Sequence, residues 1–293
     1  MLLASRAPLA FRSAPLATPS LRPMSDAPVL RLALEAMATR FEVVVATDGD
    51  AVRARAAAEA ALEAIADTER ELSRFVPSSF VSRLARTGAN QPLRTDPLDR
   101  AWLVLVDELR RLTDGAFDPC HLGDGHLVLH DPRAERVGLS ADDTPFDAGA
   151  FGKGVALDRA RDELVDAGVR TALVHGGTST ALALGAPPGR SGWGVRVERP
   201  GAEPTEVELA DRALSVSAQH GQERLPGGGH VVDARAGTRS GATPMVACTA
   251  PRATLADAWS TAVLAHGPAP ALLDAAAATG VHFLWLGDRS RAD

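Results

Sequence analysis

A glycine-rich segment with the sequence DAGAFGKGVALD, residues 147–158, runs directly into a predicted helix. The first N–H groups of a helix have no partner within the helix, and the helix dipole makes that end attractive to phosphates. Lys153 adds a full positive charge, and it is the single Lys among 31 Lys and Arg residues. The segment is not a Walker loop, because Gly154 replaces the Ser or Thr that would hold magnesium. It indicates either a phosphate-binding turn or a plain glycine-rich start of a helix.

A carboxylate and a hydroxyl share one face of a second predicted helix. Asp257 and Thr261 are four residues apart in TLADAWSTAVLAHG, residues 254–267. Both groups are hard oxygen ligands of the kind that magnesium prefers. The alternative is structural: Thr254 could cap the helix in a capping box with Asp257, and Thr261 could bond back to the preceding turn.

Two further segments carry groups that could do chemistry. In GHVVDARAG, residues 229–237, a predicted strand leads into a turn that bears His230 and Asp233. The alternative for this segment is an Asp-initiated turn at the end of a strand.

The segment CHLGDGHLVLH, residues 120–130, offers one Cys and three His, but their spacing fits no standard zinc pattern. We therefore expect a loop followed by a strand, with the His side chains facing solvent. The two cysteines of the chain, Cys120 and Cys248, are too few for a disulfide framework.

The elements that must position these groups mix helices with strands. Asp50 and Asp96 are candidate N-caps of long helices, and Gly115 ends the second of them. Helices are expected at 51–74, 97–113, 152–167, 255–267 and 271–279. Strands are expected at 40–46, 171–177, 192–200, 205–210, 214–218, 230–234, 244–250 and 281–287. The order predicts an α+β fold with antiparallel strands rather than a regular βαβ winding.

Composition excludes several classes of protein. The 293 residues are 45% hydrophobic and 23% charged, which suits a folded chain rather than a disordered one. The net charge of −6 and the lack of a basic stripe argue against nucleic-acid binding. No apolar run reaches the length of about 18 residues that a membrane span needs. Residues 1–28 are predicted to be a disordered leader or an over-long start, with Met24 as the true initiator. Residues 29–293 are predicted to form one domain.

The order of six segments resembles the ApbE family, the FAD:protein FMN transferases. MATRFEVVV (37–45), LSRFVPSSFVSRL (72–84) and GAFDPC (115–120) are similar to its first three motifs. DAGAFGKGVALDRA (147–160), HVVDARAG (230–237) and ADAWSTAVLAHG (256–267) are similar to the last three. The last three motifs are specific when taken together, although each is weak alone.

The resemblance implies a compact, two-lobed α+β domain in which mixed sheets with antiparallel strands pack against helices. It also implies an enzyme that binds FAD and Mg²⁺, transfers FMN to a Thr or Ser hydroxyl of a partner protein, and releases AMP. Two alternatives remain open: an FAD hydrolase that yields FMN and AMP, and a non-catalytic FAD-binding protein. A cytoplasmic location is expected, because residues 1–28 show neither a clean export signal nor a lipid-attachment Cys. Export by a poor signal in these residues is the alternative.

The resemblance assigns roles to particular residues. Asp257, Thr261 and the backbone carbonyl of Gly152 are the expected magnesium ligands, and Asp257 also counts as catalytic. His230 is the expected general base for the acceptor hydroxyl. Contacts with FAD are expected at Met37, Thr39, Phe75, Lys153, Asp158, Gly176, Gly177 and Asp233.

Several positions depart from the family pattern. The chain has no Tyr, so Phe75 stands where a Tyr usually stacks on the flavin. Thr178 stands where an acid is common, and VSAQHGQE (216–223) lacks the acid of the corresponding motif. The metal and pyrophosphate elements are therefore kept better than the flavin and acceptor elements.

Overall fold

The computed structural model describes residues 29–47, 49–87, 91–131, 133–199, 202–218, 232–233, 238–239 and 245–286. The predictions for residues 1–28 and for His230 lie outside these ranges.

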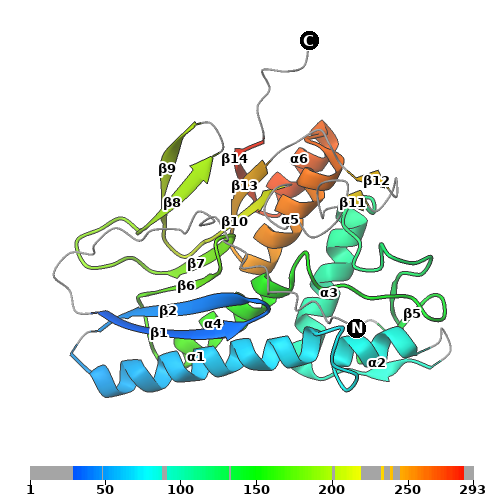
Figure 1. Ribbon diagram of the computed structural model, residues 1–293, viewed down its shortest axis with the longest axis horizontal. Helices are drawn as coiled ribbons and strands as arrows, with labels where there is room; N and C mark the ends of the chain where they lie inside the picture. The colour runs from blue at the N-terminus through cyan, green and yellow to red at the C-terminus, as the bar shows by residue number, and fades with distance from the viewer. Residues whose placement is uncertain are drawn as a thin grey trace, which may run out of the picture.

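A seven-stranded antiparallel sheet forms the centre of the fold (Figure 1). Its strand order is β1-β2-β6-β7-β10-β13-β14. The strands are β1 (Val29–Ala36), β2 (Thr39–Ala46), β6 (Ala172–Gly176), β7 (Thr180–Leu184), β10 (Ala213–Ala218), β13 (Met245–Ala250) and β14 (His282–Trp285). Strands β6 and β7 are buried along their whole length, which explains why their sequences are nearly all apolar.

Three helices cover one face of this sheet. Helix α1 (Ala51–Leu72) contacts β1 and β2, α4 (Gly152–Asp166) contacts β6 and β7, and α5 (Ala253–His266) contacts β10 and β13. Helix α6 (Pro270–Ala278) follows α5. The opposite face packs on the hairpin of β8 (Trp193–Arg199) and β9 (Ala202–Leu209), where Trp193, Val195 and Leu209 meet Val44 and Leu173.

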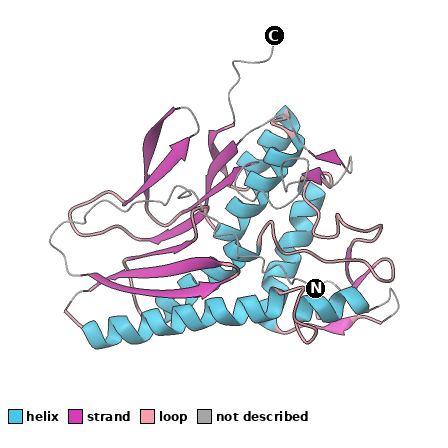
Figure 2. Ribbon diagram, in the orientation of Figure 1, coloured by secondary structure: helices cyan, strands magenta, loops and turns pink. Residues whose placement is uncertain are grey.

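The smaller elements lie beside this layered core (Figure 2). Helices α2 (Phe80–Arg86) and α3 (Pro97–Leu112) accompany a three-stranded sheet of β3 (Leu93–Arg94), β5 (Arg136–Leu139) and β4 (Leu127–Leu129). The short strands β11 (Val232–Asp233) and β12 (Thr238–Arg239) pair with each other.

The α+β fold with antiparallel strands is confirmed. The predicted N-caps are also confirmed: Asp50 accepts a hydrogen bond from the Arg53 N–H group, and Asp96 accepts one from the Asp99 N–H group. The proposed cap at Thr254 is wrong, because α5 begins at Ala253 and its N-cap is Arg252. Strands β1 and β7 of the central sheet were not predicted, and neither were helix α2 and the short strands β3, β5 and β12.

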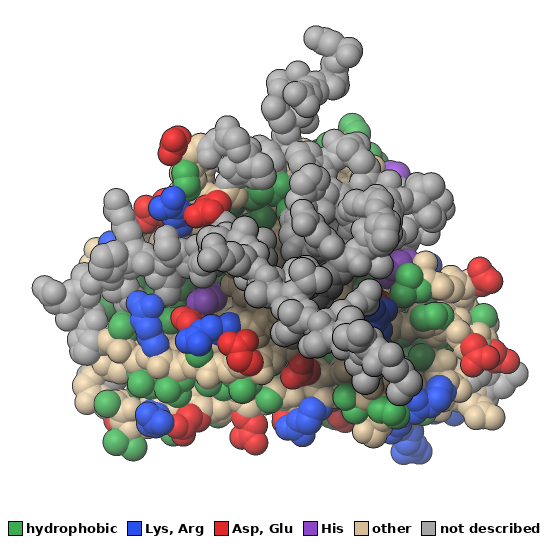
Figure 3. Space-filling view, in the orientation of Figure 1, with side chains coloured by type: hydrophobic (Ala, Val, Ile, Leu, Met, Phe, Trp, Pro, Cys, Tyr) green, Lys and Arg blue, Asp and Glu red, His purple; other side chains and the backbone are tan. Residues whose placement is uncertain are grey.

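The surface carries mixed charge. On the face shown in Figure 3, the described basic and acidic side chains lie intermixed rather than in patches of one sign. None of the helices in the described part of the chain is long and apolar enough to cross a membrane.

Two residues with unusual backbone geometry join β1 to β2. Ala36 pairs with Thr39, so Met37 and Ala38 alone form the loop, and both have positive φ angles, of 50° and 56°. Positive φ at both positions is the mark of a type I′ turn, which Gly and Asn favour and which costs other residues energy. The Met37 N–H group donates to Glu69 Oε1 on α1 at 2.6 Å, which ties the turn to the helix.

We expect Ala38→Gly to stabilise the protein by about 0.5–1 kcal/mol, because Gly adopts positive φ without the clash that Ala suffers. Urea denaturation of the two proteins measures this difference. Ala33→Gly is the matched control, because Ala33 is exposed in the middle of β1, and it should destabilise by a similar amount. A loss of stability with Ala38→Gly would show that the turn carries no strain.

Candidate functional site

The glycine-rich turn that precedes α4 is fixed by aromatic side chains at both ends. Phe146 and Phe151 are buried on either side of it, with ring centroids 6.3 Å apart. Trp102 of α3 contacts both rings, at 6.2 Å and 5.8 Å. Such pairs contribute packing energy beyond their buried area. The turn is therefore held by the core, and the start of α4 is held with it.

Asp257 of α5 reaches across to the start of α4. Its Oδ2 accepts a hydrogen bond from the Gly154 N–H group at 2.8 Å, and its Oδ1 accepts one from Thr180 Oγ1 at 2.7 Å. The Gly154 N–H group is one of the first-turn donors that a helix leaves unpaired. Asp257 thus caps α4 from a neighbouring helix, and the capping box within its own helix does not form.

Asp158 of α4 makes the reciprocal contact with α5. Its carboxylate accepts hydrogen bonds from the N–H groups of Ala253 and Thr254, at 2.8 and 3.1 Å, and from Thr254 Oγ1 at 2.6 Å. The helices approach so closely that a Cβ at Gly154 would lie 2.5 Å from the Ala253 carbonyl oxygen. This contact explains why Gly, rather than Ser or Thr, occupies position 154. Asp158 thus caps α5, while a contact between Asp158 and FAD stays a prediction.

A group of hydroxyls lies beside Asp257. Ser217 Oγ on β10 is 2.8 Å from Ser260 Oγ and 3.4 Å from Thr261 Oγ1, both on α5. Ser260 Oγ also lies 3.1 Å from Ser215 Oγ and donates to the Asp257 carbonyl at 3.1 Å. The structure therefore joins the Asp257 carboxylate to the Thr180 hydroxyl, and it links Thr261 to Ser215, Ser217 and Ser260 in a neighbouring group of hydroxyls.

The chemistry of this donor set fits a magnesium ion. The Asp257 side chain is only 4% exposed and forms no ion pair with another described residue. A buried carboxylate without a cation is costly, so a cation would offset that cost. No cluster of three His, Cys, Asp or Glu side chains suited to a metal occurs in the described ranges. One carboxylate with hydroxyls suits Mg²⁺, which often completes its coordination with water and substrate phosphate.

Four more of the predicted residues lie together at the β1–β2 turn. Gly177 has a φ of 59°, and its N–H group donates to the Arg40 carbonyl at 2.8 Å. A Cβ at Gly177 would lie 2.3 Å from Thr39 Oγ1. A Cβ at Gly176 would lie 2.5 Å from the Phe41 ring. The two glycines thus let the β6–β7 turn approach Thr39 and Phe41 at the start of β2, next to Met37 in the β1–β2 turn.

The other predicted FAD contacts do not lie next to one another in the described part of the chain. Lys153 is half-buried in the first turn of α4 and makes no hydrogen bond or ion pair with another described residue. Phe75 is 81% exposed in the loop between α1 and α2. Asp233 lies in β11, and its side chain is outside the description.

Sequence reasoning missed the residues that complete the site. Thr180, Ser215 and Ser217 alternate with apolar residues on β7 and β10, so their hydroxyls share the sheet face that α5 covers. Ser260 sits between the predicted ligands in sequence. An analysis of strand faces would have placed the three strand hydroxyls on one side, but not opposite Asp257.

The Cys and His side chains of residues 120–130 do not converge. Burial raises the pKa of the Cys120 thiol to about 12, and His126 Nδ1 lies 2.9 Å from Ser140 Oγ. The segment forms a loop followed by β4, as expected. His126 and His130 are exposed, but His121 is half-buried, with its Nδ1 3.0 Å from the Asp118 carbonyl oxygen.

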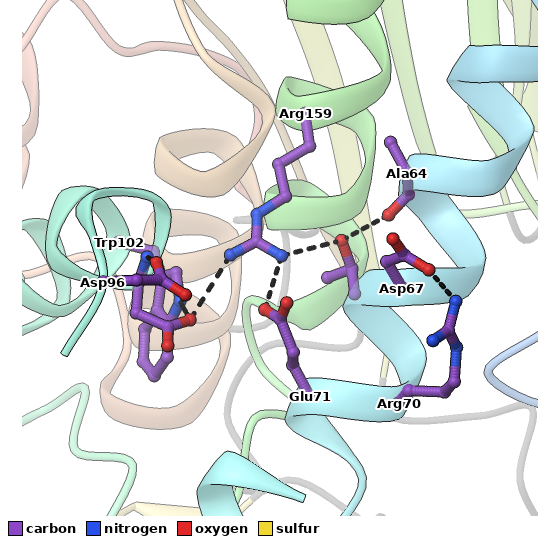
Figure 4. A network of polar contacts seen from close by, with 9 residues as sticks. Ala64, Asp67, Arg70, Glu71, Asp96, Trp102 and Arg159 are labelled. Carbon is purple, nitrogen blue, oxygen red and sulfur yellow. Dashed lines mark hydrogen bonds and ion pairs between the residues drawn. The ribbon is translucent and has the colours of Figure 1, made fainter. Parts of the chain in front are cut away.

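A charged network joins α4 to α1 and α3 (Figure 4). Arg159 of α4 donates to Glu71 at 2.5 Å and to Asp99 at 3.4 Å, and Asp99 also accepts from the Trp102 indole at 3.2 Å. Burial, helped by the charge of Glu71, raises the pKa of Asp99 to about 6, although Trp102 and Arg159 oppose the shift. The network thus joins α4 to the Trp102 that packs on the glycine-rich turn.

The raised pKa of Asp99 has a consequence for stability. The folded protein takes up a proton at this carboxyl below about pH 6, and the unfolded chain does so only below about pH 4. The contribution of Asp99 to the free energy of unfolding therefore falls as pH rises from about 4 through 6. We expect the unfolding free energy of the wild type, relative to Asp99→Asn, to fall by about 1 kcal/mol between pH 5 and pH 7.5. Urea denaturation at several pH values measures it. A difference that grows with pH would mean that the Arg159 ion pair dominates.

Asp158→Ala should destabilise the protein by about 2–4 kcal/mol, because it leaves buried donors at the start of α5 without an acceptor. Asp162→Ala is the matched control, since Asp162 lies on the same helix with its side chain 59% exposed, and it should change stability by less than about 0.5 kcal/mol. Denaturant titration of both variants tests this. Equal effects would show that Asp158 is no cap.

The comparisons with known proteins agree with the fold. Similar solved structures include the ApbE protein of Thermotoga maritima (22% identity, 87% of this chain and 93% of that chain, TM-score 0.74). They also include the flavin transferase ApbE of Vibrio cholerae (16% identity, 87% of this chain and 92% of that chain, TM-score 0.73). A third is the flavinyl transferase ApbE of Pseudomonas stutzeri (21% identity, 88% of this chain and 91% of that chain, TM-score 0.74). No protein in the comparison with curated sequences matches this chain. The sequence model of the ApbE family matches residues 37–128 and 121–285, so the chain belongs to the ApbE family.

Proposed function

We propose that this protein is a Mg²⁺-dependent FAD:protein FMN transferase, which moves FMN from FAD to a Thr or Ser hydroxyl of an acceptor protein and releases AMP. The observation that carries the proposal is the buried carboxylate of Asp257, which joins the start of α4 to the Thr180 hydroxyl of the sheet. Two of the similar structures are described as flavin or flavinyl transferases, which supports the same class of reaction.

The phosphates of FAD are proposed to bind at the start of α4. Helix N-termini attract phosphate, and the half-buried Lys153 adds a positive charge within the first turn. Asp257, Thr261 and the Gly152 carbonyl would hold the magnesium ion beside these phosphates. When bound, that ion would neutralise phosphate charge and make AMP a better leaving group.

The rest of FAD is proposed to contact the loops at the same end of the sheet. Met37, Thr39, Gly176 and Gly177 are proposed to contact FAD together, because the glycines bring the β6–β7 turn against the β1–β2 turn. Phe75 offers an exposed ring for the flavin. Asp158 and Asp233 complete the proposed set, although Asp158 also caps α5.

The transfer step needs a base for the acceptor hydroxyl. We propose His230, because a neutral imidazole near pH 7 can accept that proton. The acceptor oxygen then forms a bond to the phosphorus of the FMN half, and the bond from that phosphorus to the bridging oxygen of AMP breaks.

The proposal is tested by incubating the purified protein with FAD and Mg²⁺ and measuring AMP, free FMN and flavin-labelled peptide. One sample contains a peptide with the sequence Asp-Gly-Ala-Thr-Gly-Ala-Thr, and its control has both Thr residues replaced by Val. We expect AMP and FMN-labelled peptide in equal amounts, and no label on the Val peptide.

Two other outcomes would contradict the transferase. AMP with only free FMN in both samples would identify an FAD hydrolase, in which water replaces the acceptor hydroxyl. Bound FAD without AMP would identify a binding protein.

A further inference from the structure

Hydrogen bonds hold the loop between α1 and α2 in place. Ser79 Oγ donates to the Ser73 carbonyl at 2.6 Å, and the Phe75 N–H group donates to Ser73 Oγ at 3.3 Å. Arg86 of α2 donates to the Pro77 carbonyl at 2.5 Å. These bonds fix the backbone on both sides of Phe75, whose side chain is 81% exposed. The Phe75 ring is therefore open to solvent, where a planar ligand could stack on it.

Arg74 links this loop to the glycine-rich turn. Its Nη1 donates to Asp147 Oδ2 at 3.0 Å, and its Cζ lies over the Phe75 ring, 5.0 Å from the centroid. The other oxygen of Asp147 accepts a hydrogen bond from the Gly149 N–H group at 2.8 Å. One guanidinium thus contacts both the exposed ring and the carboxylate that shapes the turn before α4.

We propose that Arg74 is a positioning residue for the flavin ring of FAD, and this inference rests on the proposed function. Arg74 packs over Phe75 and, through Asp147, sets the distance between that ring and the start of α4. A ligand with a planar ring at one end and phosphates at the other would then meet both sites at a fixed separation. Preorganising the two sites reduces the ordering cost of binding.

The geometry favours this role over a role in stability. The Arg74 and Asp147 side chains are 48% and 24% exposed, and an ion pair of that exposure contributes little to folding. A guanidinium can lie over a ring and donate to a carboxylate at the same time, which an ammonium group does less well. Arg74 should therefore affect ligands that carry the flavin ring and leave ligands without it unaffected.

Titration calorimetry of the full chain with Mg²⁺ and either FAD or ADP tests the inference. We expect Arg74→Ala to weaken FAD binding about fivefold, equal to about 1 kcal/mol, and to change ADP binding less than about twofold. Arg74→Lys should fall between the wild type and Arg74→Ala. The visible absorption spectrum of bound FAD should move toward that of free FAD in Arg74→Ala.

A double-mutant cycle shows whether Arg74 acts through Phe75. In a Phe75→Ala background, Arg74→Ala should cause no further loss of FAD affinity. The matched control is Arg70→Ala, one turn earlier on α1, where Arg70 pairs with Asp67 on the surface with its side chain 71% exposed. This variant should bind both ligands as the wild type does.

Three results would overturn the inference. Equal loss of FAD and ADP affinity in Arg74→Ala would make Arg74 a support of the glycine-rich turn alone. Unchanged FAD affinity would remove its role altogether. A wild-type protein that binds ADP but not FAD would reject the proposed function, and the role of Arg74 with it.

Discussion

The N-termini of α4 and α5 are held against each other by one carboxylate from each helix. Asp257 of α5 accepts from the Gly154 N–H group, and Asp158 of α4 accepts from the first N–H groups of α5. Each helix therefore satisfies donors that the other leaves unpaired. The contact needs a residue without a Cβ at position 154. The remaining elements hold this junction in place: the sheet lies under both helices, and aromatic rings fix the turn before α4.

The same junction brings two carboxylates and two helix N-termini close together. Two positive helix ends face two buried carboxylates, and Thr180 and Ser217 add hydroxyls from the sheet. Asp158 is satisfied by its helix-capping bonds, with Arg252 Nε at 3.3 Å as well. Asp257 has only neutral described partners. This asymmetry is the physical reason why we propose Asp257 as the metal ligand, whereas the bonds of Asp158 show a helix cap.

Much of the fold could be predicted from the sequence, because its signals are local. Asp50 and Asp96 precede helices that they cap, and the α+β class follows from the order of apolar patterns. The cap of α5 could not be predicted, since Asp158 lies about 95 residues away from the N–H groups that it satisfies. For the same reason, Thr254 and Asp257 looked like a local capping box. Spacing identified Asp257 and Thr261 as a pair, but the hydroxyls opposite them come from strands whose register only the folded sheet defines.

The proposed reaction depends on Asp257 being a magnesium ligand as well as a cap. The most direct test is the affinity for FAD with and without Mg²⁺, in the wild type and in Asp257→Asn, whose amide oxygen can still accept from the Gly154 N–H group. We predict that Mg²⁺ raises the affinity of the wild type at least about tenfold, while Asp257→Asn binds FAD equally with and without Mg²⁺. An undiminished response to Mg²⁺ in Asp257→Asn would contradict the account and leave Asp257 as a helix cap alone.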